Sequence, residues 1–224
     1  LVLALGLRAC VFETFTVTGK AMLPSVFPGD TVIASKVSYG VRVPGSGALL
    51  IDWGDIERGD LVILANVGDP PMTLIRRVVG VPGDEILVDD IEISYRPYTG
   101  KQEDKTPWTK IPCESIEGTN SYCLQEFNGR KAWVRGIERD ASGNPQGNVN
   151  PTFKGAGKLD EEHVFVAADD RRDGQDSRRF GPVHINKIVG KVTRLWIPTR
   201  DFSKLEVNER VKALAKDRRY LGRL

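Results

Sequence analysis

Histidine, cysteine and methionine are scarce in this chain of 224 residues, which has two histidines, three cysteines and two methionines. His163 and His184 are well separated, and the sequence has no Cys-x-x-Cys pair. The ligand spacing of a typical zinc site is therefore missing. We expect no metal and no cofactor.

The chain also lacks a strong charge imbalance and a long apolar run. Its net charge is +2, and it carries no nucleic-acid-binding motif, so we expect no nucleic-acid partner. The apolar run at residues 1–7 is far shorter than the roughly 20 residues that span a bilayer. Two interpretations of this run stay open: a buried strand or helix turn, and the outer end of a membrane anchor with Arg8 at the interface.

Short apolar runs bounded by glycine and proline turns make up much of the rest. Such runs are typical of strands, and they occur at residues 31–35, 61–64, 72–80, 164–167 and 191–198. The dipeptide Asn128-Gly129 predicts a hairpin turn. The sequence therefore predicts a mostly β fold.

Residues 19–30, Gly-Lys-Ala-Met-Leu-Pro-Ser-Val-Phe-Pro-Gly-Asp, form the most distinctive segment. Pro24 and Pro28 fix their own φ and push the preceding residues out of the helical region, and Gly29-Asp30 favours a turn. Met22 is therefore expected at a strand-to-loop junction, where a functional group lies exposed on a rigid support.

The segment resembles the nucleophile box of type I signal peptidases, the Ser/Lys-dyad proteases of the S26 family that remove signal peptides. Residues 57–63, 75–84 and 169–181 resemble further segments of that family, in the same order. The matching box positions are Pro24, Gly29, Asp30, Arg77, Gly83, Asp84, Asp169, Arg171, Asp176, Ser177 and Arg178. The resemblance implies an antiparallel β core.

Three positions depart from the family pattern, and each departure removes a catalytic part. Ala21 stands where the family has its nucleophilic serine, Arg76 replaces the general-base lysine, and Gly174 replaces a supporting hydroxyl residue. Alanine has no hydroxyl, and a guanidinium keeps its proton in proteins. We therefore predict that the chain is inactive as written, whether these residues are natural or engineered; the number of lost parts favours a natural, degenerate member.

Other residues offer weak substitutes for the lost groups. Ser25 lies beyond the turn, Lys20 is expected to point away from its neighbour Ala21, and no nucleophile elbow supports a triad on His163 or His184. The aspartates of residues 169–176 suggest an acid pair or a cation site. The arginines interleaved with them favour a local ion-pair network instead.

The peptide-binding half of the site is expected to survive. In the family a substrate adds as a strand beside the nucleophile, and by position Phe15, Val17, Met22 and Ile75 fall where its pocket walls lie; the alternative is that these residues are ordinary core. Arg76 is expected to fill this cleft, to pair with Asp169 or to pair with a substrate carboxylate.

We predict four parts: residues 1–10 as the remnant of an anchor, 11–84 with 163–200 as the signal-peptidase-like core, 85–162 as an inserted β-rich lobe, and 201–224 as a basic tail with helical apolar spacing. Cys113 and Cys123 are candidates for a disulfide, which needs an oxidising compartment. The resemblance places the chain at the bacterial inner membrane, anchored in the bilayer, with its bulk in the periplasm.

Three functions follow from the resemblance and its departures. The first is a non-cleaving protein that binds signal peptides, exported preproteins or a membrane protein partner. The second is a signal peptidase seen in mutated form or using unrecognised groups. The third is a structural envelope protein with a vestigial groove.

Overall fold

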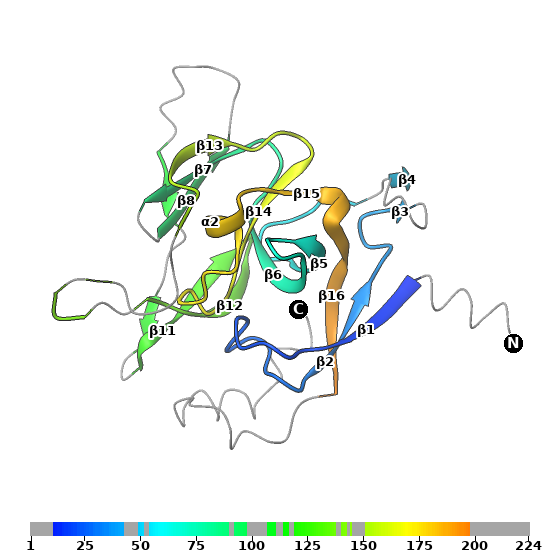
Figure 1. Ribbon diagram of the computed structural model, residues 1–224, viewed down its shortest axis with the longest axis horizontal. Coiled ribbons are helices and arrows are strands. Elements are labelled where there is room, and N and C mark those ends of the chain that lie inside the picture. The colour runs from blue at the N-terminus through cyan, green and yellow to red at the C-terminus, as the bar shows by residue number, and fades with distance from the viewer. Residues whose placement is uncertain are drawn as a thin grey trace, which may run out of the picture.

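The computed structural model describes residues 11–42, 49–51, 54–89, 92–97, 107–110, 114–116, 119–137, 140–142, 144 and 151–197. The anchor segment 1–10, the tail 201–224 and Cys113 lie outside these ranges. The described chain is mostly antiparallel β-structure, as the sequence predicts (Figure 1). No helix among the described residues is long and apolar enough to cross a membrane.

A seven-stranded sheet carries the site. Its strand order is β1-β2-β16-β5-β6-β14-β15. The bounds are β1 Phe12–Thr16, β2 Thr31–Ser35, β5 Leu61–Val67, β6 Met72–Gly80, β14 His163–Ala167, β15 Val183–His184 and β16 Ile188–Ile197. Strands from both ends of the described chain therefore share one sheet.

Three smaller sheets contain the remaining strands. Strands β13 (Gly155–Lys158), β7 (Asp84–Asp89), β8 (Glu92–Pro97) and β9 (Thr109–Lys110) form one sheet, and β10 (Glu114–Ile116), β11 (Thr119–Phe127) and β12 (Arg130–Arg135) form another. β3 (Val41–Arg42) pairs with β4 (Leu49–Ile51). The structure also describes the short helix α2 (Ser177–Phe180) and the 3-10 turn η1 (Ile185–Lys187). The proposed boundaries of the inserted lobe stay a prediction.

The central strand β5 explains why the core lies on both faces of the large sheet. Val62 and Leu64 pack into one apolar cluster with strands β6 and β14, whereas Leu61 and Ile63 pack into a second with β2 and β16. All four residues are buried, so the strand is continuously apolar rather than alternating. Burial of each such side chain contributes about 1.5–3 kcal/mol.

The hairpin between β11 and β12 forms at the predicted dipeptide. Asn128 and Gly129 both have positive φ, 47° and 77°, which is the backbone that a two-residue type I′ turn requires. Phe127, directly before the turn, packs with β6, β7 and β14 in a third apolar cluster. This cluster joins the smaller sheets to the large one.

Candidate active site and peptide groove

The segment 17–30 is closed into a compact loop by its own main chain. Val17 N–H donates to Asp30 O at 2.8 Å, and Gly29 N–H donates to Val17 O at 2.7 Å. The Asp30 carboxylate accepts from Phe27 N–H at 2.8 Å, and Gly29 has a φ of 88°. Pro24 follows a cis peptide bond within this loop. The box residues therefore shape the backbone around position 21.

Ala21 is buried, and its carbonyl is held from across the site. Asp170 N–H donates to Ala21 O at 2.8 Å. This bond ties the loop after β1 to the loop between β14 and α2. The side chain at this position is a methyl group, so the position carries no nucleophile.

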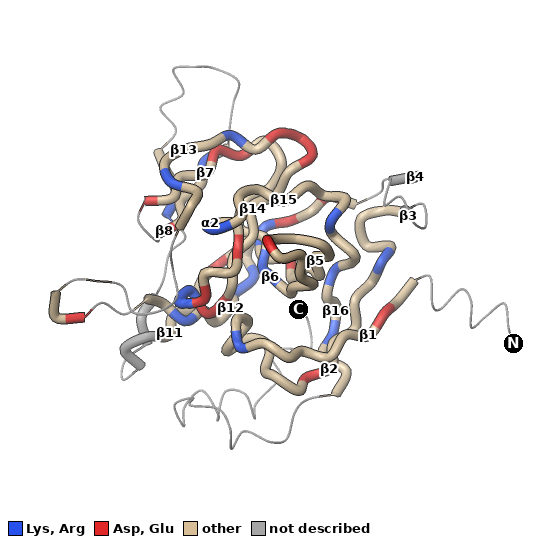
Figure 2. The backbone as a smooth tube through the Cα atoms, in the orientation of Figure 1, with Lys and Arg blue, Asp and Glu red and all other residues tan. Residues whose placement is uncertain are grey.

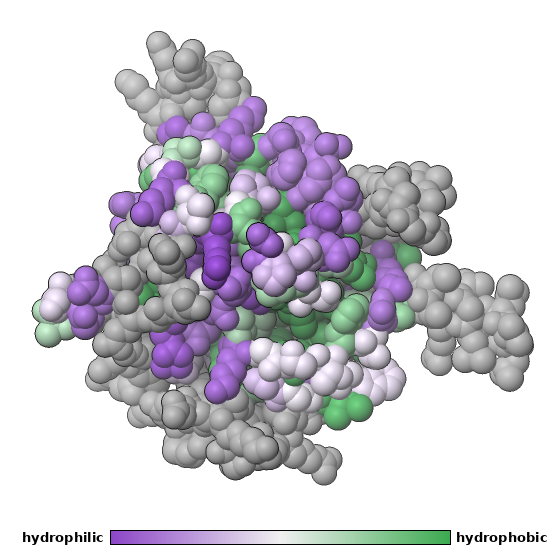
Figure 3. All heavy atoms as spheres, in the orientation of Figure 1, coloured by the Kyte–Doolittle hydropathy of each residue, from purple (hydrophilic) through white to green (hydrophobic). Residues whose placement is uncertain are grey.

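A groove of about 250 Å³ opens beside Ala21. One wall is formed by the end of β1 and the residues after it, and the other by β6 from Thr73 to Arg76. Ile63 of β5 also lines it, and Asp173 and Gln175 stand at the Arg76 end. The face in Figure 3 has apolar surface near its middle with hydrophilic residues around it.

The structure brings all four predicted pocket residues to this groove: Phe15, Val17, Met22 and Ile75. Val17 and Met22 are also buried members of the second apolar cluster, against which Phe15 and Ile75 pack. The two interpretations of these residues therefore coexist, because one side chain serves both core and groove. Their role in binding stays a prediction.

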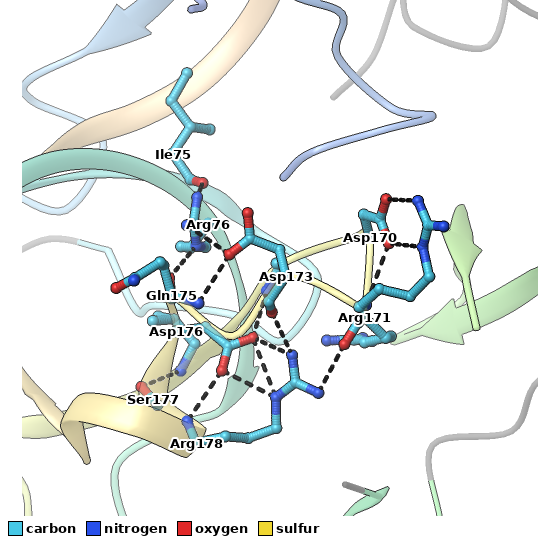
Figure 4. A network of polar contacts seen from close by, with 12 residues as sticks. Ile75, Arg76, Asp170, Arg171, Asp173, Gln175, Asp176, Ser177 and Arg178 are labelled. Atoms are coloured by element: carbon cyan, nitrogen blue, oxygen red, sulfur yellow. Dashed lines mark hydrogen bonds and ion pairs between the residues drawn. The ribbon is translucent and has the colours of Figure 1, made fainter. Parts of the chain in front are cut away.

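Arg76 reaches the groove but does not pair with Asp169. Its Nε donates to Gln175 O and its Nη1 to Ile75 O, each at 2.7 Å (Figure 4). Its nearest carboxylate oxygen in an ion pair is Asp173 Oδ1, 3.8 Å from Nη2. Burial lowers the pKa of the Arg76 guanidinium, and the nearby aspartates oppose that shift. The expected pairing with Asp169 is wrong.

Asp169 pairs with the next residue on the strand instead. Arg77 Nε and Nη2 donate to the two carboxylate oxygens of Asp169 at 2.8 and 2.6 Å. Successive side chains of a strand point to opposite faces, so Arg76 and Arg77 cannot reach the same partner. Arg77 Nη1 also donates to Gly59 O at 2.7 Å.

Ser25 is held in this same network, where its described partners are a guanidinium and a main-chain carbonyl. Its hydroxyl accepts from Arg77 Nη2 at 3.1 Å and donates to Trp133 O at 3.3 Å. A permanently charged guanidinium supplies no base to remove the serine proton. Lys20, the other nearby alternative, is exposed and does not line the groove.

The loop between β14 and α2 contains ion pairs, as predicted, and Figure 2 shows acidic and basic residues close together in this part of the chain. Asp176 is the N-cap of α2 and accepts from Ala168 N–H and Arg178 N–H, each at 3.0 Å. Arg178 Nη2 lies 2.6 Å from Asp176 Oδ2, and neither side chain is appreciably exposed. Ser177 Oγ accepts from Val166 N–H at 2.9 Å, which attaches the helix to β14.

Arg171 links the loop to the hairpin rather than to an aspartate. Its Nη2 donates to Gln125 Oε1 at 2.8 Å. Burial, assisted by the neighbouring Arg178 charge, lowers the pKa of Arg171 to about 10. Arg172 forms the second ion pair of the loop, 2.9 Å from Asp170 Oδ2. No group of three or more potential metal ligands gathers among the described residues.

Gly83 and Asp84 form the turn after β6. Gly83 has a φ of 80°, and the Asp84 carboxylate accepts from Val81 N–H at 2.8 Å and from Arg58 at 2.7 Å. Burial raises the pKa of Asp84, although these two donors oppose the shift. Gly174, in contrast, is buried beside the groove residues Asp173 and Gln175 and carries no hydroxyl.

The sequence did not predict the buried polar contacts of Asp60 or the proximity of the two histidines. Asp60 is buried and accepts from Tyr39 Oη at 2.8 Å and Lys191 Nζ at 2.7 Å. His163 and His184 face each other across β14 and β15 with ring centroids 5.1 Å apart, and neither lines the groove. The Arg-Gly-Asp motif at residues 58–60 was a signal for the first; the histidines, 21 positions apart, gave none for the second.

Cys123 is buried and disulfide-bonded, and its partner lies outside the described residues. Cys113 also lies outside them, so the pairing of Cys113 with Cys123 stays a prediction. A disulfide at β11 would stiffen the hairpin sheet that contacts the loop between β14 and α2.

Comparisons with known proteins identify the family of the chain. The family model "Signal peptidase, peptidase S26" matches residues 1–197. A signal peptidase I of Pseudomonas aeruginosa is 35% identical over 217 residues, which cover 90% of this chain and 70% of that protein. A signal peptidase I of Bacillus caldolyticus is 29% identical over 200 residues, covering 88% of this chain and 86% of that protein.

A crystal structure of a signal peptidase I from Enterococcus faecalis is also similar, with 16% sequence identity and a TM-score of 0.33. The match covers 62% of this chain and 97% of that one. Because the family model spans most of the chain, and the Pseudomonas relative is similar over nine tenths of it, this chain belongs to the S26 family of signal peptidases.

Proposed function

We propose that this chain is a non-cleaving signal peptidase homologue that binds extended peptides in the groove beside Ala21. The observation that carries the proposal is the composition of that groove. Its apolar walls are present, but the two side chains at its end are a methyl group and a guanidinium. Neither can attack a peptide bond nor accept a proton from water at neutral pH.

The strands beside the groove suit β-augmentation. β1 is an edge strand of the large sheet, and β14 pairs with β6 at Arg77, Val78 and Gly80 within the described region. The preceding part of β6, which lines the groove, is left with an edge to which no other described strand than β5 is paired. An extended peptide gains main-chain hydrogen bonds from such an edge and specificity from the pockets.

Signal peptidases act on the signal peptides of exported preproteins, which makes such segments the natural ligand class for this groove. A location at the outer face of a bacterial inner membrane, through an anchor at residues 1–10, is part of the same proposal. Binding without cleavage suits a protein that protects, presents or recruits an exported chain.

One assay tests the proposal. The purified chain is incubated with a preprotein, and cleavage and binding are measured for the wild type and for the double variant Ala21→Ser with Arg76→Lys. We expect the wild type to bind without cleaving and the double variant to recover measurable cleavage. Gly174→Ser added to the double variant should raise the rate further, because it restores a hydroxyl beside the lysine.

Each alternative has its own outcome in this assay. Cleavage by the wild type would show that unrecognised groups act, and the inactive assignment would be wrong. Failure of both forms to bind a signal peptide would leave a structural protein with a vestigial groove. A catalytically dead control, Ala21→Ser alone, separates recovery of the dyad from contamination by another protease.

A further inference from the structure

The guanidinium of Arg76 is held in place before any ligand arrives. The residue is only 4% exposed, yet it lines the end of the groove. Two carbonyls from different elements, Ile75 O on β6 and Gln175 O on the loop before α2, each accept one of its N–H groups at 2.7 Å. Figure 4 shows both bonds converging on the same side chain. The planar fork is therefore pre-organised.

The charge of Arg76 is incompletely neutralised. The neighbouring Arg77 and Arg178 each have a carboxylate oxygen at 2.6 Å, whereas the oxygen of Asp173 is 3.8 Å from Arg76 Nη2. That same Asp173 oxygen accepts from Gln175 N–H at 2.8 Å. A buried cation without a close counter-ion strongly favours an incoming anion, because the cost of its desolvation has already been met by the fold.

The main-chain acceptors at this end of the groove are already used. Ile75 O on one wall accepts from Arg76, and Ala21 O on the other accepts from Asp170 N–H. An added strand needs free carbonyls and N–H groups to continue its ladder. A peptide lying in the groove therefore competes with these donors for the carbonyl oxygens of Ala21 and Ile75.

These features favour the carboxyl-terminal end of a bound peptide. We infer that the groove, given the peptide-binding function proposed above, selects peptides whose free C-terminal carboxylate lies against Arg76 beside Ala21. The preferred ligand is then the released carboxyl end of a peptide that has already been cut. An uncut chain presents a neutral amide at the same place, and an amide leaves the guanidinium without a counter-ion.

The experiment compares three peptides that share one sequence of small apolar residues and are all N-acetylated. One ends in a free carboxylate, the second in a carboxamide, and the third continues for several more residues. Affinity for the wild-type chain is measured by fluorescence anisotropy or calorimetry. A hydrogen-bonded charge contact predicts that the carboxylate form binds about 10-fold or more tightly than the other two.

Two variants locate the preference. Arg76→Gln should remove it, whereas Arg194→Gln, which deletes an exposed arginine of β16 that does not line the groove, should keep it. Circular dichroism and thermal melting check that both variants fold. If Arg76→Gln does not fold, the comparison of the three peptides on the wild type still decides.

The outcomes separate this inference from the function on which it rests. Equal affinity for all three peptides overturns the carboxylate preference but leaves peptide binding intact. Binding of none of them overturns the peptide-binding function itself. A preference that persists in a folded Arg76→Gln protein contradicts the assignment of Arg76.

Discussion

The groove and the loop between β14 and α2 differ in how their buried charges are paired. Where the loop between β14 and α2 meets the helix, Asp176 of the loop and Arg178 of α2 form a close ion pair, and both side chains are buried. At the groove end, Arg76 is also buried, but the closest carboxylate oxygen with which it forms an ion pair is 3.8 Å away. The ion pair in the loop thus supports the fold, whereas the guanidinium of Arg76 has no close carboxylate partner and is available to bind an anionic ligand.

The comparison also separates scaffold from chemistry. The aspartates, serine and arginines at residues 169–178 resemble the family's last box, whereas the predicted losses are at Ala21, Arg76 and Gly174, beside or within the groove lining. Loss of a reactive group costs little stability, while loss of a buried ion-pair partner costs much. The four predictions below test this difference, from the largest expected effect to the smallest.

Asp176→Asn should destabilise the fold by about 3–5 kcal/mol, because it leaves the Arg178 guanidinium buried without its counter-ion. The substitution keeps the size of the side chain, so packing changes little. Urea unfolding followed by circular dichroism measures the loss. A loss below about 1 kcal/mol would mean that the loop is not the support that its geometry indicates.

Phe15→Asp should weaken peptide binding by about 10-fold or more, since it places a charge on an apolar groove wall. Phe12→Asp is the matched control, because Phe12 lies on the same strand but belongs to the opposite face with Ile33 and Trp196. Calorimetry with the same peptide compares the two variants. Equal losses for both would show that the effect comes from β1 rather than from the groove.

Two buried carboxylates should respond to pH in opposite directions. For Asp176, burial raises the pKa, but Arg178 and the backbone N–H donors outweigh it and the net pKa is lowered. Its stabilisation is therefore present above about pH 4 and is lost as the pH falls through its folded pKa. The difference in free energy of unfolding between the wild type and Asp176→Asn should therefore shrink as the pH falls below about 4.

Asp84 gives the contrasting case, because its pKa is raised, chiefly by burial. The folded state then holds the proton more tightly than the unfolded state, so stability from this group is greatest below its unfolded pKa and falls as the pH rises through its folded pKa. The free energy of unfolding of the wild type minus that of Asp84→Asn should therefore fall as the pH rises. Urea unfolding between pH 3 and 7 measures this difference. If the unfolding free energies of Asp84→Asn and Asp176→Asn, each relative to wild type, changed with pH in the same direction, the assignment would be contradicted.

Glu13→Gln should change stability by less than about 1 kcal/mol, because its pair with Lys36 is only half-buried and is screened by solvent. The two atoms are 2.7 Å apart, nearly as close as in the buried pair of Asp176 and Arg178. Thermal melting at low and high salt measures the difference. A large effect would show that distance, rather than burial, governs these pairs.

The sequence predicted local structure well because its signals are local. Strand β6 occupies residues 72–80 as expected, and Asn128 and Gly129 form the expected hairpin turn. The position of β16 between β2 and β5 was not predictable, since no local pattern specifies which strand enters a sheet. The groove residues were found only through the family resemblance, because an apolar strand residue looks the same whether it lines a core or a pocket.

The partner of Arg76 shows the limit most clearly. The sequence suggested Asp169 as a partner of Arg76. Because successive side chains of a strand point to opposite faces, the Asp169 carboxylate pairs with Arg77 instead. Gln175, whose carbonyl accepts from Arg76, was unremarkable in the sequence because any residue supplies a carbonyl. Main-chain partners of this kind leave no signature in residue type.

The bond from Asp170 N–H to Ala21 O has an evolutionary consequence. It fixes the backbone at position 21 through a carbonyl that every amino acid possesses. The bond therefore requires no particular functional group at this buried position, and a lineage can lose or regain a hydroxyl on a side chain as small as alanine by a single substitution without passing through an unfolded protein. Residue 178 has no such freedom, so we expect related chains to vary at the former long before the latter.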